Sequence, residues 1–481
     1  MDHFDIVIRG GTIVDGTGTP GRPGDVAISG DRIVAVGDVG PGRAELEIDA
    51  TGRTVSPGFI DAHTHDDRLL LSDPDMSAKV SQGVTTVVVG NCGVSLAPFV
   101  PTGRPPPPLD LLGVEWFRFP TFGAYLDELD AKPAAANGVF LIGHQTLRVR
   151  EMADLDRTAT DDEIARMRGH VTEALQAGAT GFSTGLFYPP ARAASTDEVV
   201  AIAEALQPFG GLYATHMRDE GAGLEQSVEE TLEIGRRAEV PVVISHHKAS
   251  GLPNHGKVEK TLLRIAEAAK SQRVSLDVYP YSASSTVLLP GRLNDATRVI
   301  VTWSEKMPEV AGRDLDDIAA EHGVDKFEMA SRLVPAGAIY FTMSEDDVQR
   351  VLRFAGAMIG SDGLPHDPRP HPRLWGTFPR VLGHYSRDLG LMPLEEAVRR
   401  MTGLTAAKFG IKDRGVLRVG AFADVTVFDP ATVIDAATFE DPIRPSPGID
   451  IVLVNGQPVW RDGVSTGVRS GRALRRDGPI A

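Results

Sequence analysis

The chain has 481 residues and an ordinary globular composition, with 42% hydrophobic and 24% charged residues. Its formal net charge is −16 and the charges are scattered, which argues against nucleic acid and anionic membranes as partners. The longest apolar runs have the length of strands, and the residues after Met1 lack the basic start and apolar core of a signal peptide, so a cytoplasmic location is predicted.

Short β-strands separated by glycine-rich turns are predicted at both ends of the chain. The runs that carry this pattern are 4–9, 12–14, 25–29, 32–36, 45–49, 423–429 and 451–456. Arg9-Gly10-Gly11 is one of the predicted turns. Neither group of strands is large enough to bury a core alone, so residues 1–57 and 414–481 are predicted to form one small β-sandwich domain.

Between these segments, apolar strand-like runs alternate with helical patterns. Eight such runs end in polar or small residues: 58–63, 85–90, 138–143, 180–183, 212–216, 242–246, 274–279 and 357–362. The clearest helical periodicity covers 161–177, 196–207, 223–238 and 257–271. Eight β-then-α units within 58–413 favour a (β/α)₈ barrel, a TIM-like α/β fold, over an open doubly wound sheet.

Two segments interrupt the alternation. The proline-rich stretch Pro101–Pro120 is interpreted as a surface loop. Residues 282–354 are too many for one connecting helix, and we interpret them as a subdomain inserted between the seventh and eighth strands. Loops that follow barrel strands project over the barrel mouth, so this insertion is predicted to form a lid.

The run Phe59-Ile-Asp-Ala-His-Thr-His65 places two histidines on one face of a strand end, which is a chelating geometry. Alone, such a pair is equally typical of two surface histidines. Other predicted strand ends carry Cys92, His216, His246 and Asp362, and strand ends converge at the mouth of a barrel. This donor set suits Zn²⁺ better than Mg²⁺ or Ca²⁺, and a thiolate can bridge two metals. Cys92 is the only cysteine, so no intramolecular disulfide can form.

These motifs resemble the amidohydrolase superfamily. Many of its members carry a metal-bridging carboxylated lysine on the fourth strand, but residues 178–185 contain no lysine. Gly90-Asn-Cys-Gly93 instead resembles the N-acyl-D-amino-acid deacylases, or D-aminoacylases, whose bridging ligand is a cysteine on the second strand. The match covers nearly the whole chain and continues through 213–220, 244–248, 279–281, 360–366 and 371–376.

The resemblance implies a zinc enzyme that hydrolyses the amide bond of N-acyl-D-amino acids to a carboxylate and a free D-amino acid. It implies that metal-bound water attacks the amide, with Asp362 as general base and then acid. The implied ligands of a tight zinc are Cys92, His216 and His246, and those of a weaker second metal are His63, His65, Cys92 and Asp362. The implied substrate-binding residues are Lys248, Tyr279 and Arg373, with Arg292 as an added cation for an acidic side chain.

Two other functions compete with this interpretation. A cyclic amidohydrolase of the hydantoinase or dihydroorotase type would use the same barrel and histidines, but the missing lysine on the fourth strand counts against it. A catalytically inactive barrel scaffold would not need a complete set of metal ligands, and all ligand positions are filled here. The expected partner is a small molecule, and the sequence is compatible with a monomer without fixing the oligomeric state.

Overall fold

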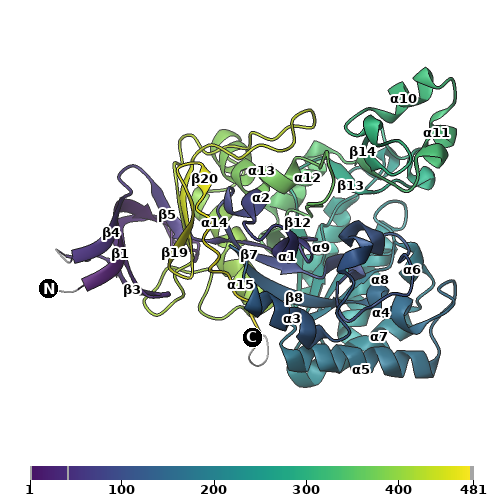
Figure 1. Ribbon diagram of the computed structural model, residues 1–481, viewed down its shortest axis with the longest axis horizontal. Coiled ribbons are helices and arrows are strands. Elements are labelled where there is room, and N and C mark those ends of the chain that lie inside the picture. Colours follow the sequence, from purple (N-terminus) through teal and green to yellow (C-terminus); the bar gives the residue numbers. More distant parts are fainter. Residues whose placement is uncertain (1–2, 41–42, 477–481) are drawn as a thin grey trace.

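The computed structural model describes residues 3–40 and 43–476. The protein consists of a helix-wrapped barrel of parallel strands, a β-sheet built from both ends of the chain, and an inserted α/β segment (Figure 1). The terminal sheet lies at one end of the molecule, and the helices of the insertion lie at the other. Among the described residues, no helix combines the length and apolar character that a membrane crossing requires.

The barrel contains all eight predicted strands, hydrogen-bonded in parallel in chain order. They are β6 (Phe59–Asp61), β7 (Val84–Val89), β8 (Asn137–Gly143), β9 (Gly181–Gly185), β10 (Leu212–His216), β11 (Val242–Ile244), β12 (Val274–Val278) and β16 (Ala357–Ile359). The first and last strands are joined by the amide of Ala62, which donates to the Ile359 carbonyl at 3.1 Å, and the amide of Asp362, which donates to the His63 carbonyl at 2.7 Å. The predicted (β/α)₈ architecture is therefore confirmed.

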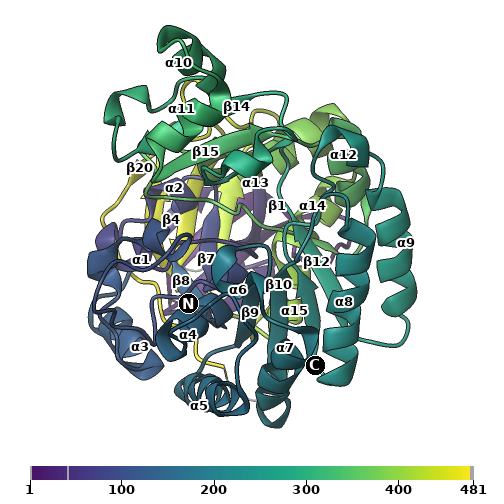
Figure 2. The same ribbon diagram turned by 90° about the vertical axis from the view of Figure 1, so that its right-hand side faces the viewer.

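The helices surround this barrel (Figure 2). Those predicted from periodicity are α5 (Asp161–Ala177), α7 (Thr196–Ala203), which runs on into η4 (Glu204–Phe209), α8 (Leu224–Arg237) and α9 (Val258–Ala268). Helix α5 begins at a capping box of Thr160 and Glu163 and ends at Gly178, whose φ of 114° is left-handed. The other helices of the barrel are α1 (Leu69–Ser72), α2 (Ser77–Val80), α3 (Phe122–Ala131), α4 (His144–Glu151), α6 (Pro189–Arg192), α12 (Glu345–Arg353), α13 (Arg373–Arg380), η8 (Val381–Asp388), α14 (Leu394–Met401) and α15 (Gly403–Phe409).

The terminal sheet joins the two ends of the chain where β5 and β17 pair antiparallel. Its strands are β1 (His3–Ile13), β2 (Arg22–Ser29), β3 (Arg32–Gly37), β4 (Arg43–Asp49), β5 (Thr54–Pro57), β17 (Val425–Phe428), β18 (Ile449–Val454), β19 (Gln457–Arg461) and β20 (Val464–Ser465). Ile8, Val26, Val425 and Leu453 belong to one buried core. Within the ranges expected for this domain, residues 1–2, 41–42 and 477–481 lie outside the described residues.

One predicted turn in this sheet is wrong. The strands expected at 4–9 and 12–14 are a single strand, β1, and its pairing with β2 shifts register between Ile8 and Gly11. Gly10 adopts a φ of 68°, which a glycine reaches without steric cost. The glycine pair therefore makes a bulge that bends one long strand.

The insertion forms its own antiparallel sheet in the order β13 (Ala283–Val287), β15 (Ala336–Phe341) and β14 (Val299–Ser304). Helices α10 (Leu315–Glu321) and α11 (Lys326–Leu333) cover this sheet and share a small core with it. Helix α12, at the end of the same segment, contacts α9 and the barrel strands β12 and β16. The part that projects from the barrel is therefore residues 283–341.

Candidate metal centre and substrate cavity

The six side chains predicted to bind metal lie at five strand ends on one side of the barrel. His63 and His65 follow β6, Cys92 lies in η1 (Asn91–Gly93) after β7, His216 ends β10, His246 follows β11, and Asp362 follows β16. Cys92, His246 and Asp362 have positive φ angles of 53°, 37° and 50°. Non-glycine residues rarely adopt this conformation, and it is found most often at functional sites.

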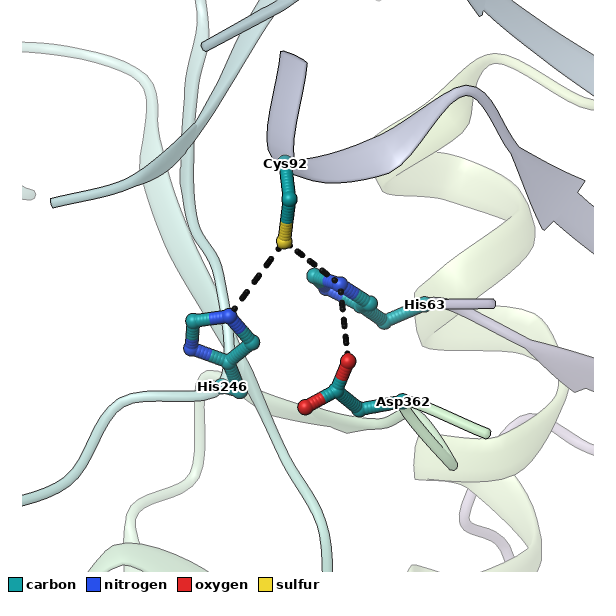
Figure 3. Close-up of side chains that lie close together, drawn as sticks. All are labelled: His63, Cys92, His246 and Asp362. Atoms are coloured by element: carbon teal, nitrogen blue, oxygen red, sulfur yellow. Dashed lines mark hydrogen bonds and ion pairs between the residues drawn. The ribbon is translucent and has the colours of Figure 1, made fainter. Parts of the chain in front are cut away.

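The Cys92 sulfur contacts both His63 and His246 (Figure 3). Its Sγ is 3.3 Å from His63 Nε2, 3.5 Å from His246 Nε2 and 3.7 Å from His216 Nδ1. Asp362 Oδ1 lies 3.5 Å from His63 Nε2 and 3.2 Å from His65 Nε2. One donor atom from each of His63, Cys92, His246 and Asp362 falls within 4.8 Å of the other three. The Cys92 sulfur therefore lies within 3.7 Å of three of the predicted histidine ligands, His63, His216 and His246.

The electrostatics of the cluster suit a cation. Burial alone raises the pKa of the Cys92 thiol, but the imidazoles of His63, His246 and His216 hold it well below its usual value. Burial also raises the pKa of Asp362, whereas Arg373 and the site histidines hold it well below its usual range. A thiolate and a carboxylate therefore share a buried pocket with imidazole nitrogens, a donor set that fits Zn²⁺.

Two buried carboxylates behind the histidines were not anticipated from the sequence. Glu220 Oε1 lies 3.0 Å from His246 Nδ1, and Glu220 Oε2 lies 3.5 Å from His216 Nε2. Asp277 on β12 lies 3.4 Å from His63 Nδ1 and accepts from the His246 amide at 2.9 Å. Glu220 follows His216 by four residues, and this spacing was the available signal. Asp277 sits in an apolar strand, where a buried carboxylate is itself unusual.

Two further histidines at strand ends lie apart from the cluster. His247 Nε2 contacts Thr261 Oγ1 of α9 at 2.8 Å, on the outer side of the strand. His144 Nε2 contacts Glu198 Oε1 at 3.1 Å, and its ring packs edge-on against Phe182. These partners account for both rings as buried structural residues.

A cavity opens beside the cluster and is lined by His65, Cys92, His216, His246 and Asp362. The insertion contributes residues 284–286 and Arg292 to its wall. Pro108, Leu111 and Leu112 also line it, so the proline-rich segment is more than the surface loop that we expected. Apolar side chains anchor this segment, since Leu109 and Leu112 are buried.

Three of the four predicted substrate-binding residues, Lys248, Tyr279 and Arg292, line this cavity, whereas Arg373 is fully buried and contacts the cavity residue Asp362; each already has partners. Lys248 Nζ is 2.6 Å from Glu220 Oε1, and Arg373 Nη1 is 2.8 Å from Asp362 Oδ2. Tyr279 lies near both cations, with Lys248 Nζ 5.7 Å and the Arg373 guanidinium carbon 4.5 Å from its ring centroid. The guanidinium carbon of Arg292 lies 4.8 Å from the Tyr340 ring centroid and 5.4 Å from that of Phe187.

Comparison with known proteins gives consistent matches over nearly the whole chain. A model of the amidohydrolase family matches residues 46–273 and 310–460. The D-aminoacylase of Alcaligenes xylosoxydans xylosoxydans is 56% identical over 474 residues, which are 98% of each protein. The N-acyl-D-aspartate deacylase of the same organism is 52% identical over 473 residues, which are 98% of this chain and 95% of the relative.

A solved structure also matches the whole fold. It is the crystal structure of the N-acyl-D-glutamate deacylase of Bordetella bronchiseptica, complexed with zinc and a phosphonate inhibitor that mimics the tetrahedral intermediate of the reaction. The two chains are 46% identical and superpose with a TM-score of 0.95, over 99% of this chain and 100% of that one.

Proposed function

The chain belongs to the amidohydrolase family and, within it, to the N-acyl-D-amino-acid deacylases, and on this premise we propose that it hydrolyses N-acyl-D-amino acids. The products are a carboxylate and a free D-amino acid. The observation that carries the proposal is the buried Cys92 thiol within reach of three histidines, on a barrel whose fourth strand, β9, contains no lysine. The relatives that are 52–56% identical over nearly the whole chain are a D-aminoacylase and an N-acyl-D-aspartate deacylase, which act on linear amides, and this disfavours a cyclic amidohydrolase and an inactive scaffold.

We assign zinc as the metal, with Cys92, His216 and His246 as ligands of a tight site. His63, His65, the shared Cys92 and Asp362 would hold a weaker second ion. The thiolate supports zinc over harder cations, and zinc is present in the Bordetella bronchiseptica relative. Bound zinc supplies a Lewis acid that polarises an amide carbonyl and lowers the pKa of a water ligand.

Asp362 is the proposed proton carrier. Its carboxylate faces the cavity beside the metal ligands, and its low pKa keeps it ionised at neutral pH. It would accept a proton from the attacking water and deliver it to the nitrogen of the departing amine. Both steps need a carboxylate within hydrogen-bond reach of the reacting amide, which the strand-end position provides.

Arg373, Lys248 and Tyr279 are proposed to hold the α-carboxylate of the substrate. Both cations lie near the Tyr279 ring, Lys248 contacts His246 and Arg373 contacts Asp362, so a carboxylate that contacts both would lie next to the metal cluster. Holding the carboxylate, the amide and the side chain fixes three of the four directions around Cα. An L-enantiomer would then place its side chain where the D-enantiomer has hydrogen, which explains the D preference.

Arg292 and the insertion are proposed to contact the side chain of the amino acid. Arg292 lines the cavity between the rings of Tyr340 and Phe187, so it can offer a cation to an acidic D side chain. This assignment agrees with the high identity to a deacylase of N-acyl-D-aspartate. Residues 283–341 would cover the bound substrate as a lid. The cytoplasmic location stays a prediction from the sequence.

A substrate panel tests this function. Purified protein loaded with zinc should hydrolyse N-acetyl-D-leucine, N-acetyl-D-phenylalanine, N-acetyl-D-aspartate or N-acetyl-D-glutamate, with the released amine measured colorimetrically. The L-enantiomers should be poor substrates, and the cyclic amide dihydrouracil should not be opened. Equal hydrolysis of D and L substrates, or preferred opening of dihydrouracil, would contradict the proposal.

A further inference from the structure

We propose that Glu220 is a positioning residue that fixes the two histidines of the tight zinc site, His216 and His246, in their metal-binding orientation. The inference rests on the zinc site proposed above. It concerns a buried carboxylate that contacts the ring nitrogens turned away from Cys92 and that the proposed mechanism does not use.

The two imidazoles present different nitrogens to Cys92. His216 turns Nδ1 toward the sulfur, at 3.7 Å, and His246 turns Nε2 toward it, at 3.5 Å. The remaining nitrogens, His216 Nε2 and His246 Nδ1, both face Glu220, at 3.5 and 3.0 Å, and each faces a different carboxylate oxygen. A neutral imidazole carries one N–H, and an acceptor at one nitrogen places the lone pair on the other. Glu220 is therefore placed to accept from both rings when their other nitrogens bind zinc: its contact with His246 has hydrogen-bond length, at 3.0 Å, and its contact with His216 is longer, at 3.5 Å. Lys248 Nζ, 2.9 Å from His246 Nδ1, can only donate, so it contacts this nitrogen only while the ring proton lies on Nε2.

The position of Glu220 is itself well fixed. It lies in the turn after β10, where Asp219 accepts from the amides of Gly221 and Gly223 at 2.6 and 3.0 Å. The Glu220 carbonyl accepts from the Ser250 amide at 2.7 Å. Lys248 Nζ, 2.6 Å from Oε1, balances the buried charge. Backbone and side-chain contacts thus hold the carboxylate between the two rings.

Glu220 could instead be a metal ligand, because His216, Glu220 and His246 also offer donor atoms within 4.8 Å of one another. The ammonium of Lys248 argues against this role. It lies 2.6 Å from the carboxylate and 2.9 Å from His246 Nδ1, so a positive charge already occupies that side of the rings. A divalent ion placed there would be repelled by the lysine. Orientation of the ligands is the role that remains for the carboxylate.

The experiment compares zinc affinity in the parent protein and in Glu220→Gln by competition with a chromophoric chelator. The amide can still accept from one ring, but its NH₂ group cannot accept from the other. Loss of a carboxylate behind metal-binding histidines typically weakens affinity about 10–100-fold, and we expect a decrease of this size. The matched control is Glu163→Gln, which removes a buried carboxylate from the start of α5, where Glu163 contacts Arg157 and Thr160. This control should keep parental zinc affinity.

Two further measurements separate positioning from a loss of fold or of a ligand. Cobalt-substituted Glu220→Gln should keep the thiolate-to-cobalt absorption band of the parent, because all metal donors are retained. If Glu220→Gln does not fold, Glu220→Asp tests the inference instead. Its shorter carboxylate keeps the charge beside Lys248 but cannot reach both rings, so a lower zinc affinity is again expected.

Zinc affinity within about twofold of the parent in either folded Glu220 variant would overturn the inference, since the expected loss is about tenfold or more. A parent protein that binds no tight zinc would overturn the proposed function instead, so the two failures are distinguishable.

Discussion

Replacing Arg373 by methionine should lower kcat/KM for every N-acyl-D-amino acid that the protein hydrolyses. The guanidinium is fully buried and contacts both Asp362 and the carbonyl of Ser285. In the proposed complex this guanidinium also pairs with the α-carboxylate of the substrate. Removing one partner of a buried charge pair across a binding interface costs about 2–5 kcal/mol, and each factor of ten corresponds to about 1.4 kcal/mol, so kcat/KM should fall by roughly 1.5–3.5 orders of magnitude. Methionine keeps most of the side-chain volume, which limits cavity formation.

The assay measures kcat/KM over a panel of N-acetyl-D-amino acids with apolar and acidic side chains. Arg292→Met is the matched control, because Arg292 is a second arginine of the proposed substrate site, but it lines the cavity from the insertion. Arg373→Met should weaken all substrates by a similar factor, whereas Arg292→Met should weaken mainly N-acetyl-D-aspartate and N-acetyl-D-glutamate. Zinc content should stay at the parental value in both variants.

Nearly parental kcat/KM in folded Arg373→Met across the whole panel would refute this description of the carboxylate site. If Arg373→Met lowered kcat/KM only for acidic substrates, Arg373 rather than Arg292 would be the residue that contacts the side chain of the substrate.

Three further predictions concern other buried groups. Asp362→Asn should abolish turnover and keep tight zinc, because the amide cannot accept a proton, and substantial activity in this variant would reassign the base. Lys79→Met should lower the free energy of unfolding by about 3–5 kcal/mol, since Lys79 Nζ lies 3.0 Å from Asp61 in a fully buried pair, and an unchanged denaturation midpoint would contradict this. Burial raises the pKa of Glu198, but His144, the Ala159 amide and Arg148 lower it to about 2, so its stabilisation should be present above pH 4.5 and be lost as the pH falls toward 2. The stability difference between the parent and Glu198→Gln should accordingly shrink below pH 4.5, and a difference independent of pH would contradict the assignment.

Much of the fold could be predicted because local chemistry and tertiary structure agree. Strands of a parallel barrel are buried on both faces, and the run Val84–Val89, buried throughout, reads as an apolar segment even without context. Helix α5 carries its own start and stop signals in Thr160, Glu163 and Gly178. At Gly10 the local signal was ambiguous, because a glycine pair suits a turn and a bulge equally, and pairing with β2 decided between them.

The site was less predictable where its contacts join distant segments. Barrel topology brings the strand ends together, so the cluster of His63, Cys92, His246 and Asp362 could be expected. Nothing in the local sequence indicated that Lys248 pairs with Glu220, since these residues are 28 positions apart. The apolar cavity wall that the proline-rich segment forms could not be predicted either. Composition predicts a loop, but it does not predict the residues against which the loop packs.

Zinc titration of metal-free protein, followed by hydrolysis of an N-acetyl-D-amino acid, tests the central assignment most directly. Activity should be absent without metal and should return with the first equivalent of zinc, while folded Cys92→Ala should neither bind zinc tightly nor recover activity. Full activity in protein shown by elemental analysis to contain no metal, or parental zinc content in folded Cys92→Ala, would contradict the account.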